Sequence, residues 1–479
     1  MTVSNHLEKL EFSRRLIKLY HLVGTSEEPE MGDATGVATD VAQGYEENKE
    51  KMIRPFPIKP LPNELLCQIL QFIIQPGYPL DDSPDIRKHQ LATVCRRWRD
   101  IILQTPAFWT YIRLTPHQEK SFVKAHVERS RQCPLDVAIF GFTLGEHSSF
   151  PAFLKIVEPT MHRWRSLTLP EDTVDNLLIL ESFGRTVFPL LARFSSRRIS
   201  NYGNYPQSFC LENVPTLRRL DMRTSTISGD FRFPPTLEKF SLNMVQYREG
   251  TFAFLQSPSL QGLKMLSLWT FTERRNIQPN SIHLPLLTHF HCRVTPAEPL
   301  LQGLSTPNLT HLGYCQAFKE NLTSVFNGMR SKWKNVRGLN LHLVPLAAHT
   351  WKEDYLEGLT ALYLAAPEVQ HVEARVDVLN RLLGVRRGIC PIDQWERLER
   401  LTVPGDIDSL NSMRRFIVPW LKRRRSTSKP VIQIRFILYP IPGCILEVER
   451  ENVLNEIGEY CDGVDMYVEE TEGGFRDIW

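Results

Sequence analysis

A repeated pattern of apolar residues limits the possible folds of this 479-residue chain more than any other feature. The pattern is Leu-x-x-Leu-x-Leu, with other apolar residues in place of some leucines, and the first eight copies begin 20 to 27 residues apart. The copies begin at Trp164, Leu191, Leu217, Leu237, Leu263, Leu287, Leu309, Val336 and Leu398, with a further possible copy at Leu359. Because alternate residues of a strand point to opposite sides, each copy predicts a short strand whose fourth and sixth residues face the core. Turn residues follow the copies, and several copies lead into a helical stretch such as the one at 322–329.

A repeat of this length is typical of leucine-rich repeats, in which one strand and its return segment stack on the next to form a solenoid. The predicted fold class is therefore α/β, with a curved parallel sheet and helical or loop returns. Such repeats usually carry Asn or Cys eight residues after the first leucine, but all nine clear copies have another residue there. We therefore expect an irregular solenoid, with the region 351–395 helical rather than a clean repeat. The alternative is a set of unrelated strands that share a leucine bias.

A compact apolar unit, predicted over 53–114, precedes the repeats. Its apolar residues recur at helical spacing and predict three short helices. The first opens at Pro62, the second at Pro84 with Ser83 as its N-cap, and the third contains Trp98. Three short helices bury little surface, so we expect this unit to complete its core against a partner.

This helical unit carries an ordered set of motifs, namely Leu61-Pro62-Asn63-Glu64-Leu65-Leu66, Ile69-Leu70, Leu91-x-x-Val94-Cys95-Arg96-Arg97-Trp98 and Pro106-Ala107-Phe108-Trp109. The set resembles an F-box, although the stretch between Phe72 and Leu91 is longer than the usual F-box spacing. The join that follows contains Arg129-Ser130 and Cys133-Pro134-Leu135-Asp136-Val137. It resembles the join in many F-box proteins of mushroom-forming fungi, which carry divergent leucine-rich repeats after the F-box.

The resemblance implies a set of partners. In F-box proteins the F-box binds the Skp1 adaptor, which links it to a cullin ubiquitin ligase, and the repeat domain selects the protein substrate. By resemblance, the Skp1 contacts here would be Leu61, Pro62, Leu65, Ile69, Leu70, Val94, Cys95 and Trp98. These residues exceed what sixty residues can hide among themselves, which favours a partner interface; the alternative is that they pack on the solenoid. The implied function is a non-catalytic substrate-recognition subunit of a Skp1–cullin–F-box (SCF) ligase, and the alternative is a non-ligase leucine-rich-repeat scaffold or regulatory binding protein.

The repeats also predict a surface for the substrate. If the fourth and sixth residues of each copy face the core, the third and fifth face the opposite, concave side. The predicted substrate-binding residues there are Arg193, Arg219, Lys239, His289, His291, His311 and Arg400. With Arg197, Arg223 and Arg293 just after three of the strands, this side carries seven permanent cations against one acid, Asp221. We expect an acidic or phosphorylated substrate segment to bind there; the alternative is a solvated basic face, or one covered by the acidic end of the chain.

Other classes of function find little support in the sequence. The chain has 57 basic and 54 acidic residues, which is too balanced for a protein that binds nucleic acid or anionic lipid. Long apolar runs and an N-terminal signal core are missing, which predicts a protein of the cytoplasm and/or the nucleus. Nine scattered cysteines without Cys-x-x-Cys fit neither a disulfide framework nor a zinc knuckle. Nucleophile elbows, phosphate-binding loops and paired catalytic carboxylates are also missing, so no enzymatic activity and no cofactor are expected.

Two clusters of polar residues could serve other purposes. His289 and His291 lie two apart on one predicted strand, and His311 has the position of His289 in the next copy. Three converging imidazoles could bind zinc, but no carboxylate has a matching position, so we favour a recognition surface or ordinary solvated histidines without a metal. The basic run 422–425 follows an apolar helix and could be a nuclear import signal or the solvated end of that helix.

The predicted organisation has four parts. Residues 1–52 form an N-terminal helix and a flexible linker, 53–114 the F-box, 115–446 the divergent leucine-rich-repeat domain, and 447–479 an acidic C-terminal segment. This last segment holds eleven acidic residues and two basic ones, and would be a cap or a mobile tail. Alternation also predicts strands over 135–139 and 431–438.

Overall fold

The computed structural model describes residues 61–74, 84–142, 150–169, 179–180, 182–184, 186–196, 213–224, 233–244, 252–271, 277–316, 320–343, 354–385, 388–406, 410–439 and 447–468. The chain forms two compact units, which divide between Phe108 and Trp109. The predicted N-terminal helix and linker, Arg197, and residues 469–479 of the acidic segment lie outside the described residues. No helix within the described ranges is long and apolar enough to cross a membrane.

The first unit contains the three helices that the apolar spacing predicts. They are α3 (Asn63–Ile74), α4 (Pro84–Val94) and α5 (Arg96–Gln104), and the short 3-10 helix η1 (Pro106–Trp109) follows at the boundary. Apolar residues at helical spacing form the buried stripes of α3 and α5. These buried residues are Leu66, Leu70, Ile73, Ile74, Trp98, Ile101 and Ile102. The Arg87 guanidinium donates a hydrogen bond to the carbonyl oxygen of Ile73 at 2.8 Å, which ties α4 to the end of α3.

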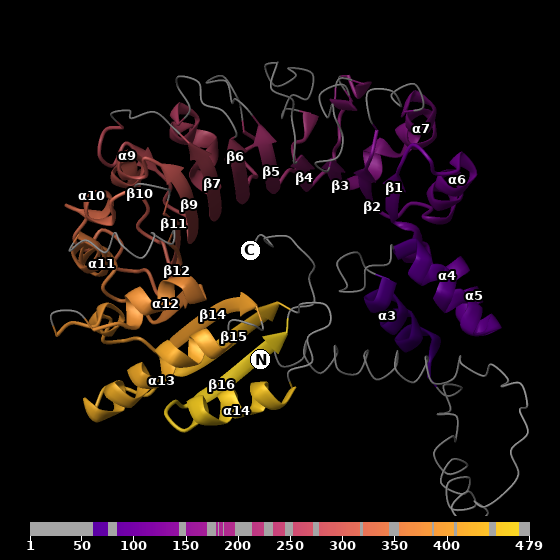
Figure 1. Ribbon diagram of the computed structural model, residues 1–479. Coiled ribbons are helices and arrows are strands. Elements are labelled where there is room, and N and C mark those ends of the chain that lie inside the picture. The colour runs from indigo at the N-terminus through magenta and orange to yellow at the C-terminus, as the bar shows by residue number, and fades with distance from the viewer. Residues whose placement is uncertain are drawn as a thin grey trace, which may run out of the picture. The chain divides into compact units, whose positions relative to one another are not determined.

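The second unit is of mixed α/β type and is built on a long parallel sheet (Figure 1). Among the described residues this sheet has fourteen strands, paired in their order along the chain, while β8 and β10 form a small sheet of their own. The strands are β1 (Tyr111–Leu114), β2 (Leu135–Ile139), β3 (Trp164–Leu169), β4 (Arg193–Ser196), β5 (Arg219–Thr224), β6 (Lys239–Met244), β7 (Met265–Phe271), β8 (Ile282–His283), β9 (His289–Thr295), β10 (Leu304–Ser305), β11 (His311–Cys315), β12 (Gly338–His342), β13 (His371–Ala374), β14 (Arg400–Asp406), β15 (Gln433–Tyr439) and β16 (Gly463–Val468). Parallel neighbours need a crossover between them, so each return segment leads the chain back to the start of the next strand.

The nine clear copies of the repeat all coincide with strands, and the strands expected over 135–139 and 431–438 are β2 and β15. In all nine copies the fourth and sixth residues are buried, as predicted. The possible copy at Leu359 is wrong, because Leu359 lies in the helix α11 (Asp354–Ala365). The strand of that region is β13, where Val372 and Ala374 are buried, and Val369, two residues before the strand, is buried as well. The region 351–395 is therefore partly helical, as expected, but it also contributes a strand.

Helices of the return segments lie on one side of the sheet, and Figure 1 shows α9, α10 and α11 there. The return helices are α6 (Lys120–Arg129), α7 (Phe150–Val157), η3 (Glu158–Arg163), η5 (Ala253–Gln256), η6 (Pro258–Gly262), α9 (Glu298–Gly303), α10 (Leu322–Phe326), α11, α12 (Val376–Leu383), η7 (Pro391–Gln394) and α13 (Leu410–Ser426). One continuous apolar core, from Ile112 to Ile457, fills the space between them and the sheet. The opposite side of the sheet, where the third and fifth residues of each copy lie, is named the open face below.

Both ends of the sheet differ from the predicted boundaries. Residues 111–114 form β1 and pair with β2, so they belong to the sheet rather than to the helical unit. At the other end, α14 (Glu447–Gly458) is followed by β16, which pairs with β15. Because Val453 and Ile457 are buried in the common core, the described part of the acidic segment is a helix followed by a strand of the sheet and not a mobile tail.

A polar ladder runs along the edge where the strands begin. In several copies a proline stands two residues before the first leucine, as in Pro215-Thr216-Leu217. The side chain of the residue after this proline donates a hydrogen bond to the proline carbonyl oxygen of the preceding copy. The pairs are Thr216 with Pro189 (3.0 Å), Thr236 with Pro215 (3.1 Å), Asn308 with Pro285 (2.8 Å) and Asn335 with Pro307 (2.7 Å). The copy that contains Asn335 has no proline of its own. These bonds satisfy turn carbonyl groups between copies that lack the usual Asn or Cys.

Candidate functional site

The first unit exposes apolar residues on α3 beside those that it buries. Leu65 and Ile69 lie one helical turn apart, next to the buried stripe; Leu65 is 46% exposed and Ile69 is half-buried. Pro62 and Cys95 are also exposed, and Leu61 and Val94 are half-buried. These six of the eight predicted Skp1 contacts are therefore available to a partner.

The other two predicted Skp1 contacts lie in the interior of the unit. Leu70 is 0% exposed and Trp98 is 7% exposed, so both pack against other parts of the fold. The sequence pattern does not separate the two groups, because each consists of apolar residues at helical spacing. Ile86 on α4 and Leu103 on α5 are exposed as well, and sequence analysis did not single them out.

Arg97 holds the start of α3 against α5. Its guanidinium donates hydrogen bonds to Oδ1 of Asn63 at 2.7 and 3.0 Å and another to the carbonyl oxygen of Leu61. The segment that contains Leu61, Pro62 and Leu65 is thus fixed by a residue of the third helix. Nothing in the sequence pattern distinguishes Arg97 from its neighbours in the motif that ends at Trp98.

The strand register brings the seven predicted substrate-binding residues to one side of the sheet. Third residues of neighbouring copies pair with one another, and so do fifth residues, which gives two rows across the open face. The first row runs Arg193, Arg219, Lys239, Met265, His289, His311, Gly338, His371 and Arg400. The second row runs Ser195, Asp221, Ser241, Ser267, His291, Gly313, Asn340, Glu373 and Thr402.

The predicted cations of the open face differ in their partners. Arg219 donates to the carboxylate of Asp221 at 2.7 Å, and Arg400 donates to Oε1 of Gln433. Arg293 lies over the ring of Trp269, with 5.2 Å between its guanidinium carbon and the ring centre. Arg193 and Lys239 form no ion pair or side-chain hydrogen bond with any residue in the described part of the chain. The cations without a partner side chain therefore lie on β4 and β6, while Arg400 and Arg293 keep their charge beside neutral partners.

The face is less uniformly basic than the sequence predicts. The open face also carries acidic residues. Glu373 of β13 lies in the second row, Asp465 of β16 is in line with that row, and Asp136 of β2 is in line with the first row. Asp136 pairs with Arg165 and accepts from Ser166 at 2.7 Å, and Asp465 lies 3.5 Å from Arg435. These acids were missed because their strands are not clear copies of the repeat.

The predicted histidine cluster forms a packed group. The rings of His289 and His311 stack with their centres 4.2 Å apart and 3° between their planes. A Cβ atom at Gly338 would come within 2.4 Å of His311, and one at Gly313 within 2.2 Å of His291. Glycine at these two positions therefore leaves the room that the rings occupy. No group of three or more potential metal ligands lies within the described ranges.

Burial keeps these imidazoles neutral. It lowers the pKa of His289 to about 4, with smaller contributions from His311 and Lys239, and it lowers the pKa of His311 as well. The pKa of His291 also falls to about 4, mainly through burial and then through His342 and Arg293. Near neutral pH the middle of the first row is thus an uncharged aromatic surface next to Lys239.

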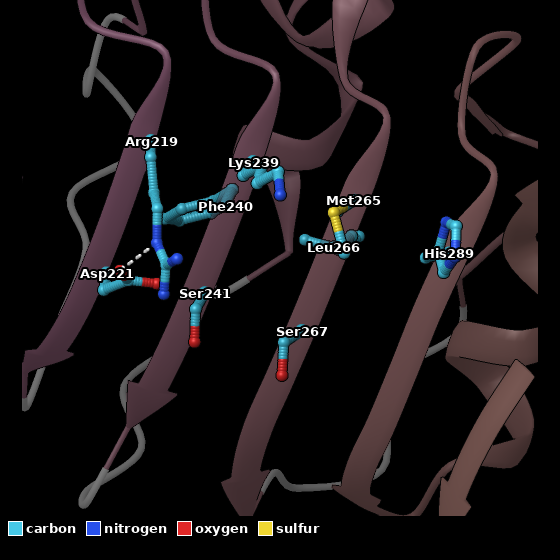
Figure 2. Close-up of a pocket in the computed structure, with 9 residues that line it drawn as sticks. All are labelled: Arg219, Asp221, Lys239, Phe240, Ser241, Met265, Leu266, Ser267 and His289. Carbon is cyan, nitrogen blue, oxygen red and sulfur yellow. Dashed lines mark hydrogen bonds and ion pairs between the residues drawn. The ribbon is translucent and has the colours of Figure 1, made fainter. Parts of the chain in front are cut away.

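A shallow hollow, open to solvent, lies on the open face over β5, β6, β7 and β9. Figure 2 shows Arg219, Lys239, Met265 and His289 along one side of it and Asp221, Ser241 and Ser267 along the other. Three of the seven predicted substrate-binding residues, Arg219, Lys239 and His289, line this hollow. Arg193 lies on the next strand, while Arg400 lies several strands away.

The basic run 422–425 is built into the fold at the end of α13. Arg424 is 3% exposed and donates to the carboxylate of Asp393 at 2.7 Å, which also accepts from the indole of Trp420 at 3.1 Å. Arg423 donates to the carbonyl oxygen of Leu383 at 2.9 Å, and Arg425 to that of Glu459 at 3.1 Å. Arg423 and Arg424 therefore anchor α13 to its neighbours, whereas Lys422 and Arg425 are exposed.

Comparison with known proteins identifies one domain. Residues 58–115, about an eighth of the chain, match the F-box-like family. This range covers the three helices of the first unit, η1 and β1. Among curated proteins, none has significant sequence similarity to the chain.

Proposed function

We propose that this chain is the substrate-recognition adaptor of a Skp1–cullin–F-box ubiquitin ligase. The observation that carries the proposal is the F-box-like domain at 58–115, because F-box domains bind Skp1 and F-box proteins are typically adaptors of SCF ligases. In this proposal Leu61, Pro62, Leu65, Ile69, Val94 and Cys95 contact Skp1, while Leu70 and Trp98 hold the helices that present them. The exposure of Leu65 supports this assignment, since anchors of protein interfaces are apolar residues that a partner covers.

The second unit, in this proposal, is a divergent leucine-rich-repeat solenoid that captures a protein substrate on its open face. The support is a repeat of 20 to 27 residues, with strands in chain order and return helices on one side of the sheet. Repeats of this kind present their strand residues as a continuous binding surface. The free cations Arg193 and Lys239 suit an acidic or phosphorylated segment of the substrate.

The chain itself would supply no catalytic group. Its partners would carry out ubiquitin transfer, and the chain would hold the substrate close to them, which raises the effective concentration of the reacting groups. Such an adaptor would act in the cytoplasm, in the nucleus or in both.

Affinity purification of the tagged full-length chain tests this proposal. Skp1 and a cullin should copurify, and proteins that accumulate on the chain when the proteasome is blocked should carry ubiquitin. A Leu61→Ala, Pro62→Ala, Leu65→Ala variant should lose Skp1, cullin and ubiquitin together. Recovery of Skp1 without a cullin would support the alternative, a leucine-rich-repeat scaffold or regulatory protein without ligase activity. Recovery of neither partner would refute an F-box role.

A further inference from the structure

The hollow on the open face and the neighbouring surface of β4 are together named the trough below. In the second row, β4, β6 and β7 carry the small residues Ser195, Ser241 and Ser267, with Asp221 on β5 between them. In the first row, the same four strands carry the long side chains of Arg193, Arg219, Lys239 and Met265. On β6 and β7 the short side chains of the second row lie beside long ones of the first row, which hollows the sheet there, while on β5 the Arg219 side chain reaches to Asp221 (Figure 2).

One end of this trough is closed. On β9 the second row continues with His291, which is 7% exposed and lies 5.8 Å from Trp269 between ring centres. From β4 to β7 the strands span about 14 Å at 4.8 Å per strand. An extended peptide advances about 3.3 Å per residue, so the trough has room for about four to five residues lying across the strands.

The free positive charges are spaced along this trough. Arg193 and Lys239 lie two strands apart, about 10 Å, and Arg219 between them is already held by Asp221 at 2.7 Å. A phosphate is bound best by several donors that converge on it, above all by guanidinium forks. Two separate cations, one of them a lysine, suit two separate carboxylates better. In a peptide with the polyproline II conformation, three residues make one turn and advance about 9 Å, so side chains three positions apart point to the same side.

We propose that the trough binds an extended segment of the substrate with two acidic residues about three positions apart and an apolar side chain at the end near His289. The inference rests on the proposed function, because it names the class of segment that the adaptor would capture. The two carboxylates meet Arg193 and Lys239, and the peptide backbone lies over Ser241 and Ser267, whose hydroxyl groups can exchange hydrogen bonds with it. The apolar side chain rests on Met265 and on the stacked ring of His289, which offers an uncharged surface.

A peptide array tests the charges. The full-length chain, coexpressed with Skp1, is applied to twelve-residue peptides that carry two glutamates at different spacings, with and without a terminal leucine. Peptides with a spacing of about three and the leucine should bind best. An exposed ion pair is worth a factor of about 1.4 to 5 in affinity, so the Arg193→Ser, Lys239→Ser variant should bind them about 2- to 30-fold more weakly. The control Lys155→Ser, Lys334→Ser removes the same charge from exposed positions off the open face and should bind normally.

A second pair of variants tests the floor of the trough without changing charge. Ser241→Phe fills the floor and should reduce peptide binding more than tenfold, whereas Thr402→Phe puts the same ring in the same row on β14, outside the trough, and should not. Equal binding by the cation variant and its control, or binding only by phosphorylated peptides, would overturn the inference. If the chain selects these peptides but neither Skp1 nor a cullin copurifies with it, the ligase role is refuted and the specificity of the trough stands.

Discussion

Replacing Leu61, Pro62 and Leu65 with alanine should weaken Skp1 binding without unfolding the first unit. Complete burial of a leucine side chain is worth about 1.5–3 kcal/mol. Leu65 is 46% exposed, so its coverage by Skp1 should contribute about half of that value, or about 0.7–1.4 kcal/mol. If Leu61 and Pro62 contribute similarly, the triple variant loses about 2–4 kcal/mol, which corresponds to a dissociation constant about 30- to 700-fold higher.

The buried residues of the same motif should behave differently. Leu70 is fully buried, and truncating such a leucine costs about 2–5 kcal/mol of folding free energy. Trp98→Ala should cost about 3–5 kcal/mol for the same reason. A unit of three short helices does not tolerate such losses, so these two variants should lose Skp1 because the unit unfolds. They therefore do not report on the interface.

The assay should measure binding and folding on the same samples. Exchange of labelled Skp1 into the purified complex gives the affinity, and hydrogen exchange of α3 and α5 shows whether the first unit is folded. Leu364→Ala is a matched control, because Leu364 is 38% exposed but lies on α11 in the second unit. Wild-type Skp1 affinity in a triple variant whose helices remain protected would refute the proposed interface.

Three further predictions concern the second unit. Gly338→Val should lower the free energy of unfolding by about 1–3 kcal/mol, because a Cβ atom there would approach within 2.4 Å of His311. The control Gly463→Val on β16 should be nearly neutral, because no atom lies within 4 Å of the position of its Cβ. Equal thermal stabilities of the two variants would contradict the packing of the histidine stack. Arg424→Met should lower the free energy of unfolding, measured by denaturant titration, by about 3–5 kcal/mol, since it leaves the buried carboxylate of Asp393 without its cation. Arg425→Met should lower it far less, because Arg425 is exposed. A small effect at Arg424 would show that solvent reaches the ion pair. Burial lowers the pKa of His291 to about 4, against about 6.5 in the unfolded chain, so the unfolded chain binds more protons between these pH values. The contribution of His291 to stability should therefore be constant above about pH 6.5 and should fall as the pH drops toward 4. His291→Asn should flatten the dependence of the melting temperature on pH over that range, and an unchanged dependence would show that His291 is not buried in solution.

The strands were predictable because an apolar pattern with a fixed start also fixes the register of parallel neighbours. The same pattern fails where two periodicities overlap. Leu359, Leu362 and Leu364 fit the repeat, but Leu359, Leu362, Tyr363 and Ala366 fit one face of a helix equally well. The structure resolves the ambiguity in favour of the helix, with Leu364 turned outward. The true strand, β13, escaped notice because alanine occupies its sixth position.

The rows of the open face were also predictable, but their electrostatics were not. Row membership follows from strand register alone, so all seven predicted residues lie on one side of the sheet. Charge pairing depends on rotamers and on strands that carry no clear repeat, such as the one with Glu373. The sequence therefore overestimated the charge of the whole face and did not distinguish the compensated Arg219 from the free Lys239. Nor did it reveal that Gly313 makes room for a buried ring.

The apolar surface of the first unit is only partly visible in the sequence. Apolar residues occupy more than half the circumference of α3, but two short neighbouring helices can cover only a stripe of it. The apolar residues of α3 beyond this stripe are visible as a surplus in the sequence, and this surplus indicates a partner. Which residues belong to it is not visible, because Leu65 and Leu66 are identical in chemistry and adjacent in sequence, yet one is exposed and the other buried. Only the positions of α4 and α5 decide between them, so an interface made from residues typical of a core can be expected from the sequence but located only on the folded unit.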